Sequence, residues 1–307
     1  MEVEHPMQNP KVSVIIISYN RAQLLKVAMQ TVFDQTFEDF ELLIIDDGSP
    51  DDTENTVKAF HDPRLRYIKH AQNQGEGAAR NSGVQHAEGE YIAFLDDDDE
   101  WLPNKLQLQV ELLDAQPKHV GFVHSALINF YADTGEEVEK KRPVETVSGK
   151  VFDRLLQDNF VILSTVMARK ECFDAAGPFD LSIPAGLDYD MWVRISQNYE
   201  FAYIDTPLIK YRIHRNNLGS NFGLQIRGQE AFFNKYHAYI STPSKPNSIR
   251  YFKLGLLYCF TNDFKTARRI YLKSIRLYPL NPKPYAGFLM TFLGPWAYRK
   301  LLALNGK

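Results

Sequence analysis

The sequence is poor in cysteine and has no long apolar run. Its only two cysteines, Cys172 and Cys259, fit neither a metal-binding spacing nor a disulfide framework. This scarcity is typical of a reducing compartment. No apolar stretch reaches the roughly 18 to 20 residues of a membrane-spanning helix, and the polar N-terminal stretch MEVEHPMQNPK does not resemble a signal peptide. We therefore expect a cytoplasmic protein, and attachment to the inner face of the cell membrane stays open.

Two nucleotide-binding fingerprints are also missing. No GxxxxGK[ST] loop is present, and the stretch GEGAAR at residues 75–80 has Arg80 where a dinucleotide fingerprint has its third glycine. These departures argue against a nicotinamide site and disfavour nucleotidyl transfer. Arg80 then either faces a diphosphate or base, next to the flexible Gly75 and Gly77, or lies on the exposed side of a helix.

Acidic residues are nearly absent from the C-terminal part. From Arg250 onward eleven lysines and arginines accompany a single acid, Asp263, although the whole chain has a net charge of −3. Twelve aromatic residues lie in the same region. This mixture is typical of a surface for anionic lipid or for single-stranded nucleic acid. We expect no nucleic-acid partner and hypothesise peripheral membrane contact through residues 250–307. The alternative is a helical subdomain that packs its aromatics on the rest of the chain or on a second subunit.

The first hundred residues alternate between strand and helix patterns. Short apolar runs at residues 12–18, 41–45, 65–69 and 91–95 are typical of buried parallel strands. The spacing of about thirty residues between the first two runs is that of a βαβ unit. The pattern predicts an α/β fold with a Rossmann-like, mostly parallel sheet flanked by helices.

Beyond residue 100 the pattern becomes more varied. We expect a helix with Pro103 as its first residue, strands at 120–130, 160–168 and 207–214, a polar excursion at 131–143 and a helix at 186–196. The chain is helical by pattern after about residue 224. We therefore predict one domain at residues 1–222 and a helical, basic and aromatic extension at residues 223–307.

Three polar clusters follow predicted strands directly. They are Ser18-Tyr19-Asn20, Asp46-Asp47-Gly48-Ser49 and the four aspartates of FLDDDDEW, Asp96 to Asp99. Ligands of open α/β sheets bind outside the carboxyl ends of the strands. We expect these clusters to meet at one edge of the sheet.

The four aspartates are either an acidic surface turn or a metal site. Charge runs are usually solvated, and carboxylates suit a helix N-terminus. In an extended segment, however, Asp96 and Asp98 point together while Asp97 and Asp99 point elsewhere. Mg²⁺ and Mn²⁺ prefer one or two carboxylates plus phosphate oxygens. Such a metal suits a reaction in which a nucleoside diphosphate leaves, and that reaction needs a base.

Five segments in order carry a family resemblance. VSVIIISYN, LLIIDDGSPDDT, GAARNSGVQHAEGEYIAFLDDDDEWLPNKL, FDLSIPAGLDYDMWVRIS and YRIH, within residues 10–215, resemble glycosyltransferase family 2, the inverting enzymes of GT-A fold. The resemblance implies transfer of a sugar from a nucleotide-diphosphate donor, such as a UDP-sugar, with Mn²⁺ or Mg²⁺. It also implies a glycan or lipid-linked acceptor and a role in bacterial cell-surface polysaccharide or glycoconjugate synthesis.

The resemblance also assigns roles to positions. Asp188 matches the general base, and Asp190 a structural carboxylate. The resemblance assigns donor binding to Ser18, Tyr19, Asn20, Asp47, Asp96 and Asp97, and metal binding to Asp98 and His214. Arg80 joins the donor-binding residues because of its position beside Gly75 and Gly77, not through the resemblance. Asp97 stands where the family often has a small residue, and Leu187 where it often has an acid.

Simpler interpretations stay open at this point. Asp188 suits a helix N-cap, and a lone histidine such as His214 is often structural. The alternative function is a catalytically silent nucleotide-sugar or glycan-binding partner that acts through its basic tail. The sequence also leaves a homo-oligomer open.

Overall fold

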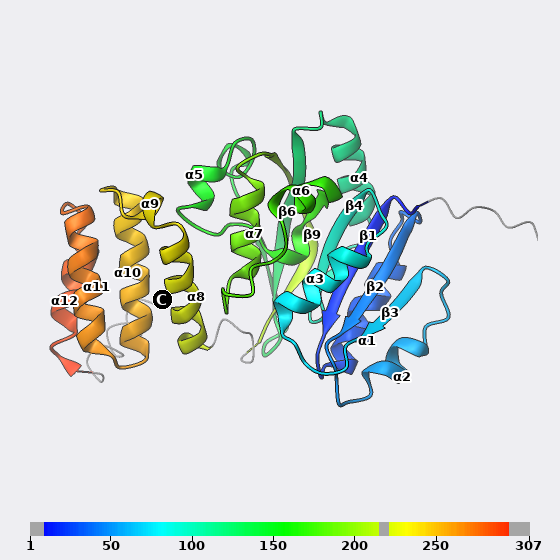
Figure 1. Cartoon of the computed structure of the whole chain (residues 1–307), viewed down its shortest axis with the longest axis horizontal. Coiled ribbons are helices and arrows are strands. Elements are labelled where there is room, and N and C mark those ends of the chain that lie inside the picture. Colours follow the sequence, from blue (N-terminus) through cyan, green and yellow to red (C-terminus); the bar gives the residue numbers. More distant parts are fainter. Residues whose placement is uncertain (1–8, 215–220, 295–307) are drawn as a thin grey trace, which may run out of the picture. The chain divides into compact units, whose positions relative to one another are not determined.

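The computed structural model describes residues 9–214 and 221–294, which divide into two compact units (Figure 1). The first unit consists of Met1–Arg154, Phe160–Leu181 and Asp188–His214. The second consists of Leu155–Asn159, Ser182–Leu187 and Arg215–Lys307. Helix α8 (Phe222–Lys235) begins at the boundary predicted from the sequence, but the second unit also includes two short earlier segments.

The N-terminal apolar runs form four parallel strands, as predicted. β1 (Val12–Ser18), β2 (Phe40–Asp46), β3 (Leu65–Lys69) and β4 (Tyr91–Asp96) lie in the order β3-β2-β1-β4. Helices α1 (Ala22–Phe33), α2 (Thr53–Lys58) and α3 (Glu76–His86) connect them. β1 is buried along almost its whole length, because helices cover both faces of the sheet.

The rest of the sheet mixes strand directions. β8 (Met167–Arg169) pairs antiparallel with β4 and with β6 (Val120–Tyr131), and β6 pairs parallel with β9 (Glu200–Ile213). β5 (Glu100–Trp101) pairs antiparallel with β9 at the end of the sheet. The helical elements of this part are α4 (Lys105–Ala115), α5 (Phe152–Leu155), α6 (Lys170–Ala176), α7 (Leu187–Ile195) and the short 3₁₀ turns η1 (Val144–Thr146) and η2 (Leu163–Thr165).

Two local predictions are wrong, and a third is incomplete. The expected strand at 160–168 is mostly irregular, because the 3₁₀ turn η2 interrupts it and only Met167–Arg169 pairs in the sheet. The polar excursion at 131–143 contains a charged edge strand, β7 (Glu136–Lys140), which turns back on β6 through the left-handed Gly135. Pro103 precedes its helix, since α4 begins at Lys105 and the Pro103 carbonyl accepts a hydrogen bond from Thr36 N at 2.8 Å.

Helices cover both faces of the sheet, giving three layers. On one face Val14 and Ile16 of β1 share a core with residues of α1, α2 and α4. On the other face Ile15 meets α3 so closely that a Cβ added at Gly83 would lie 2.5 Å from it. Aromatic pairs join this second face to its other elements, with Phe94 of β4 against Phe173 of α6 and Phe122 of β6 against Trp192 of α7. The ladders of β1 with β2 and β4 place Ser18 beside Asp46 and Ile17 beside Asp96, so the polar ends of these strands are neighbours.

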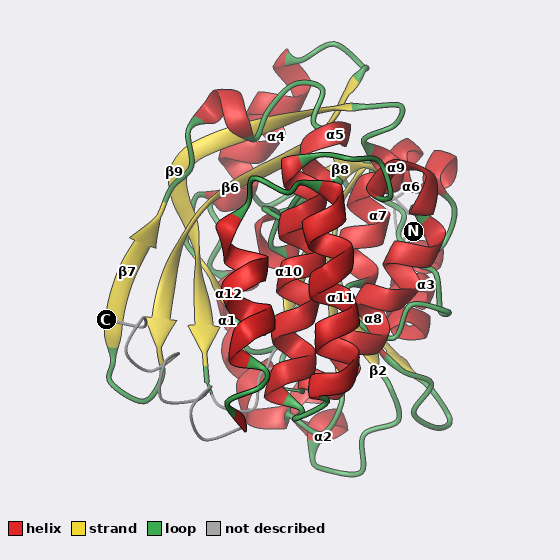
Figure 2. Cartoon of the chain, turned by 90° about the vertical axis from the view of Figure 1, so that its left-hand side faces the viewer, coloured by secondary structure: helices red, strands yellow, loops and turns green. Residues whose placement is uncertain are grey.

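The second unit is helical, as the sequence predicts. It contains α8, α9 (His237–Ile240), α10 (Lys245–Phe260), α11 (Phe264–Leu277) and α12 (Pro282–Met290), and Figure 2 shows the last three packed side by side. Their packing centres on Tyr271, whose ring would lie within 2.4 Å of a Cβ at Gly255 and 2.7 Å of one at Gly287. Among the described residues, no helix combines the length and apolar character needed to cross a bilayer.

Candidate functional site

The four aspartates leave the sheet in a turn. β4 ends at Asp96, and Asp99 N donates to the Asp96 carbonyl at 3.1 Å. The predicted alternation of side chains along an extended segment is therefore wrong beyond Asp96. Asp97 and Asp98 instead point to one partner, because both carboxylates accept from Nη1 of Arg21 at 3.0 Å.

The end of β9 adds a histidine to this group. His214 Nε2 lies 3.0 Å from Oδ2 of Asp98, the same oxygen that Arg21 contacts. Asp97 also accepts from the Ser18 hydroxyl at 2.8 Å. The structure thus brings together Ser18, Asp97 and Asp98 from two of the three predicted polar clusters, and it adds His214 from the end of β9.

Asp99 stabilises the aspartate turn through buried hydrogen bonds. Its Oδ2 accepts from the Ser164 hydroxyl at 2.6 Å, and its Oδ1 accepts from Arg212 N at 2.9 Å. The same Ser164 oxygen accepts from Asp96 N at 3.0 Å. Asp99 and Ser164 are almost fully buried. These hydrogen bonds fix the aspartate turn to the end of β9, where His214 lies.

The loops after β1 and β2 are tied to each other. Asn20 N donates to the Ser49 hydroxyl, and Ala22 N donates to Asp51, both at 3.0 Å. Asn20 has a φ of +58°, in the left-handed region that asparagine tolerates. Tyr19, directly before Asn20, is 47% exposed, so its ring is free to stack on a planar ligand.

Asp47 anchors a neighbouring loop. Its carboxylate contacts His70 Nδ1 at 2.7 Å and accepts from Gln74 N at 2.9 Å and Gly75 N at 2.8 Å. Gly48 beside it has a φ of +76°, and a Cβ there would lie 2.7 Å from the backbone of Gln72. Asp47 therefore shapes the rim between β2 and α3, and its oxygens have only part of their acceptor capacity left for a ligand.

Arg80 is buried, so the interpretation as an exposed helical arginine is wrong. It lies 3% exposed in α3, pairs with Glu76 and approaches Oδ1 of Asp96 at 3.4 Å. The guanidinium also lies over the ring of Phe179, 5.8 Å from its centroid. Its Nε is buried and has no hydrogen-bond acceptor among the described residues. The described residues therefore leave one donor of this buried guanidinium unsatisfied.

Asp188 and Asp190 lie in the first turn of α7 and have different surroundings. Asp190 is fully buried and accepts from Nε of Arg194 at 2.9 Å, which agrees with a structural carboxylate. Asp188 is only partly buried. Burial raises the pKa of Asp188, while the positive charge of Arg80 opposes this rise. A carboxylate with a raised pKa is a stronger base when ionised.

Burial and mutual repulsion raise the pKa values of two carboxyl groups in the aspartate turn. Removal from water raises the pKa of Asp96 to about 7 and that of Asp97 to about 6, with Asp98 adding to both. Arg80 opposes the rise at Asp96, and Arg21 opposes it at Asp97. A bound cation relieves this repulsion.

Within residues 9–214 and 221–294, no group of three or more His, Cys, Asp or Glu side chains is arranged to hold a metal. Asp98 and His214 therefore offer at most a pair of ligands. A pair suits ions that take their remaining ligands from water and phosphate, as Mg²⁺ does.

Sequence reasoning missed two residues that build this site. Arg21 directly follows the first polar cluster, so its position was a usable signal. Ser164 gave none, because it lies 65 residues after Asp99 in a segment that was predicted to be a plain strand.

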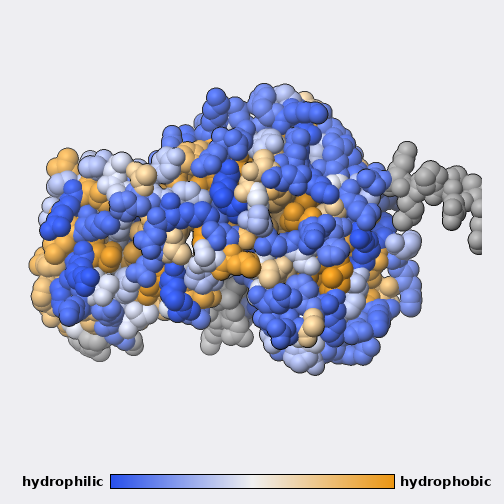
Figure 3. Space-filling view, viewed as in Figure 1, coloured by the Kyte–Doolittle hydropathy of each residue, from blue (hydrophilic) through white to orange (hydrophobic). Residues whose placement is uncertain are grey.

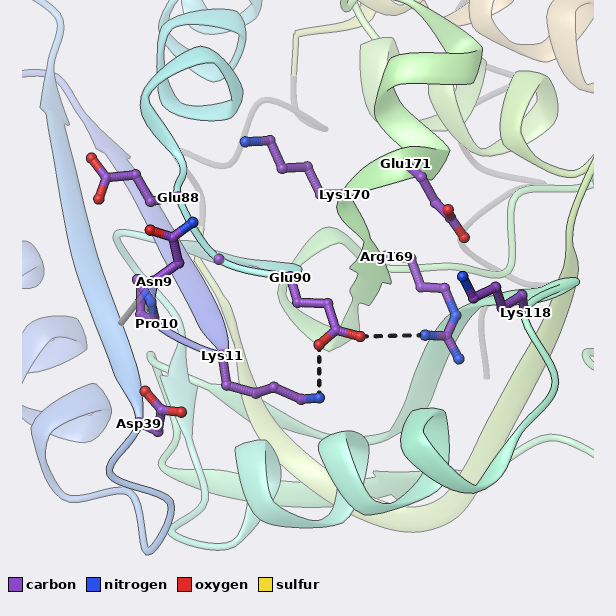
Figure 4. A pocket seen from close by; sticks show the side chains of 11 residues that line it. Asn9, Pro10, Lys11, Asp39, Glu88, Glu90, Lys118, Arg169, Lys170 and Glu171 are labelled. Carbon is purple, nitrogen blue, oxygen red and sulfur yellow. Dashed lines mark hydrogen bonds and ion pairs between the residues drawn. The ribbon is translucent and has the colours of Figure 1, made fainter. Parts of the chain in front are cut away.

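A separate pocket of about 500 Å³ lies at the other edge of the sheet, before the first residues of β1 and β4 and at the last residue of the antiparallel β8 (Figure 4). Lys11 lies 2.8 Å from Glu90, and Arg169 lies 3.8 Å from the same carboxylate. Lys11, Glu90 and Arg169 therefore balance one another's charge within this pocket.

The fold and the acidic turn after β4 define the class of the protein. A mixed sheet with the order β3-β2-β1-β4, flanked by helices, is the GT-A fold of nucleotide-sugar transferases. Over 94% of this chain and 92% of the other, the structure resembles Staphylococcus aureus TarS 1–349 in complex with UDP-GlcNAc, with a TM-score of 0.65 and 17% identity. It also resembles mannosyltransferase PcManGT from Pyrobaculum calidifontis in complex with GDP-Man and Mn²⁺, with a TM-score of 0.59 and 20% identity over 98% of this chain and 80% of the other.

Residues 13–168 match the model of glycosyl transferase family 2, and the chain belongs to this family. An uncharacterized glycosyltransferase of Rickettsia felis is 36% identical over 67% of this chain, but the match spans only 34% of that relative's length. The Escherichia coli UDP-Glc:alpha-D-GlcNAc-diphosphoundecaprenol beta-1,3-glucosyltransferase WfgD is 28% identical over 73% of this chain and 85% of its own. The family resemblance seen in the sequence is confirmed.

Proposed function

We propose that the protein is an inverting glycosyltransferase that moves a sugar from a nucleotide-diphosphate donor, most simply a UDP-sugar, to an acceptor hydroxyl. The observation that carries this proposal is the gathering of Arg21, Asp97, Asp98 and His214 at the carboxyl ends of β1, β4 and β9. Buried Arg80, with its unused Nε, adds a second cationic group beside Asp96. This combination suits a diphosphate with a cation.

The donor's nucleoside has a place at the ends of β1 and β2. Ser18, Tyr19 and Asn20 form one side, with the Tyr19 ring exposed. Asp47 shapes the other side through its hold on the loop at residues 70–75. The two similar structures hold UDP-GlcNAc and GDP-Man, which supports a nucleotide sugar as the donor here.

The residues at the aspartate turn fit a divalent metal. Asp98 Oδ2 and His214 Nε2 lie 3.0 Å apart, and burial together with the neighbouring carboxylates raises the pKa of Asp96 and Asp97. Asp98 and His214 would hold Mn²⁺ or Mg²⁺, with Asp96 and Asp97 near the ribose or the ion. Such an ion, when bound, stabilises negative charge on a departing diphosphate.

Asp188 supplies the base for the transfer. Its carboxylate takes the proton of the acceptor hydroxyl, and the hydroxyl oxygen attacks the anomeric carbon from the face opposite the nucleotide. The bond from that carbon to the diphosphate oxygen breaks in the same step, and its electron pair leaves with the diphosphate. The configuration inverts, and Arg80 faces the charge that develops.

The acceptor is a glycan or a lipid-linked sugar in bacterial surface polysaccharide synthesis. WfgD is named for an acceptor on diphosphoundecaprenol. Putative glycosyltransferases of colanic acid and teichuronic acid biosynthesis also match this chain. These names support a place in the same class of reactions.

Nucleotide release from a panel of nucleotide sugars, with and without Mn²⁺, tests the proposal. Asp188→Asn removes the base and keeps the shape, so we expect loss of transfer while UDP binding remains. A ligand at 100 times its Kd stabilises a protein by about 2.7 kcal/mol, so a thermal shift reports binding in the same samples. Asp174→Asn is the matched control, because Asp174 is an exposed carboxylate on α6.

Two outcomes contradict the proposal at different points. Asp188→Asn turning over at the wild-type rate shows that another group is the base. A chain that binds UDP with Mn²⁺ but releases no nucleotide from any donor and acceptor pair is instead a catalytically silent binding partner.

A further inference from the structure

Helix α12 presents an apolar face to solvent. Leu289 is 65% exposed, and Phe292 and Leu293 in the following turn are each 63% exposed. With Tyr285, these residues recur at the spacing of one helix face, while Pro284, Gly287 and Thr291 are buried on the other. Single exposed apolar residues are ordinary, but a continuous group of them marks an interaction surface.

Helix α11 presents a basic face beside it. Lys265, Arg269, Lys273 and Arg276 are exposed and recur every three or four residues, so they lie along one side of the helix. Figure 2 shows α11 and α12 next to each other on the side turned to the viewer, and Figure 3 shows hydrophobic and strongly hydrophilic residues mixed over them.

A cation contact joins the two faces. The guanidinium of Arg268 lies over the ring of Phe292, 4.8 Å from its centroid, and its Nη1 approaches the Thr291 carbonyl at 3.5 Å. Asp263, the single acid in residues 263–294, caps α11 by accepting from Thr266 N at 3.0 Å. Six basic residues in this stretch give it a net charge of +5. The charge is therefore of one sign where the apolar residues are exposed.

We propose that α11 and α12 dock the protein on an anionic lipid bilayer. In this arrangement the side chains of Leu289, Phe292 and Leu293 enter the boundary between headgroups and acyl chains, as in interfacial amphipathic helices. The basic residues of α11 meet the anionic headgroups, where each contributes about fivefold in binding, and Tyr285 lies at headgroup level.

The composition favours lipid over a protein partner. From Pro284 to Gly294 the side chains that carry a polar group are Tyr285 and Thr291, and Thr291 is buried. A protein interface needs hydrogen-bonding groups of matching geometry around its apolar centre. An anionic bilayer needs only apolar side chains that can enter it and basic side chains that meet its headgroups, and this surface supplies both.

Co-sedimentation of the full chain with vesicles tests the proposal, independently of sugar transfer. The probes are vesicles of phosphatidylcholine alone and of phosphatidylcholine with 30% phosphatidylglycerol. We expect binding to the anionic vesicles that weakens as salt is raised. Lys265→Gln with Arg269→Gln and Lys273→Gln should lower binding on the order of 100-fold, and Leu289→Gln with Leu293→Gln by roughly tenfold or more.

Matched controls lie in the first unit. Leu181 is 62% exposed, so Leu181→Gln makes the same chemical change at similar exposure elsewhere. Lys58, Lys140 and Lys141 are exposed, and their joint change to Gln removes the same charge. Both controls should bind vesicles as the wild type does. All changed residues are exposed, so thermal melting should confirm that every variant is folded.

Three results overturn the proposal. One is equal binding to neutral and anionic vesicles, and another is unchanged binding of the Leu289 and Leu293 double variant. The third is a wild-type chain that binds no vesicles but forms a concentration-dependent dimer that this double variant abolishes. That outcome assigns the surface to a second copy of the chain.

Discussion

Removal of the Ser164 hydroxyl should destabilise the aspartate turn. This hydroxyl is fully buried, donates to Asp99 at 2.6 Å and accepts from Asp96 N at 3.0 Å. In Ser164→Ala both partners lose their contact at once. The Ser164 carbonyl, which accepts from Trp101 Nε1 at 2.9 Å, is unchanged by the substitution, so the loss is confined to the hydroxyl.

The magnitude follows from the two contacts. A hydrogen bond to a charged group contributes about 1.5–3 kcal/mol, and a buried amide left without an acceptor costs about 1 kcal/mol or more. We therefore expect a loss of about 3 kcal/mol in the free energy of unfolding of the first unit. For a domain of this size each kcal/mol lowers Tm by roughly 2–4 °C, which gives a fall of roughly 6–12 °C.

Urea unfolding and thermal melting measure this loss. Ser196→Ala is the control, because the Ser196 hydroxyl is also buried but donates only within its own helix turn, to the Val193 carbonyl at 2.8 Å. A double-mutant cycle with Asp99→Asn isolates the pair, and we expect a coupling of about 1–2 kcal/mol. A Ser164→Ala variant within about 0.5 kcal/mol of the Ser196→Ala control would refute the reasoning.

Two further predictions concern acid sensitivity and metal. His124 is buried among aromatic rings, and burial lowers its pKa to about 4. The folded state favours the neutral form of His124. The contribution of neutral His124 to the stability of the fold is therefore complete above about pH 6.5 and is lost as the pH falls toward 4. Urea titrations should show that the free energy of unfolding falls by about 2 kcal/mol between pH 7.5 and pH 5. This fall should disappear in His124→Gln but persist in a variant of the exposed His61. Mn²⁺ should raise the Tm of Arg21→Ala more than it raises the Tm of the wild type. The reason is that the cation then replaces the guanidinium that Asp97 and Asp98 share. A Mn²⁺-induced rise in Tm that is equal to or smaller than that of the wild type contradicts this prediction.

The sequence predicts the parallel half of the sheet well. Its strands are β-branched or apolar runs that are buried on both faces, so their signal is local and does not depend on distant residues. The predicted run at residues 12–18 coincides with β1. Because β2, β1 and β4 are neighbours, the meeting of their polar ends also follows from the pattern.

The remaining strands depend on distant contacts. The segment at 160–168 has strand composition, but Ser164 serves the aspartate turn, and the 3₁₀ turn that places it there interrupts the strand. β7 could not be predicted for the opposite reason, because its charged residues give no apolar signal. It forms because Gly135 turns the chain back onto β6. Neither outcome is encoded within its own segment.

The four aspartates of the turn have different hydrogen-bond partners, which indicate different roles. Asp97 and Asp99 accept from the buried hydroxyls of Ser18 and Ser164, which hold them whether or not a ligand is present. Asp96 contacts an arginine, Arg80, at 3.4 Å rather than a hydroxyl.

Asp98 also lacks a hydroxyl partner, and it shares Arg21 and His214. An arginine can move from a carboxylate to a phosphate, because its fork of donors fits both, whereas a buried serine hydroxyl has no such alternative. The hydroxyl-bound aspartates therefore keep the turn in place. Asp97 shares Arg21 with Asp98 but also keeps the Ser18 hydroxyl. The carboxylates of Asp96 and Asp98 have no hydroxyl partner among the described residues, so substitutions there should impair donor binding more than folding, whereas substitutions at Asp97 and Asp99 should impair folding first.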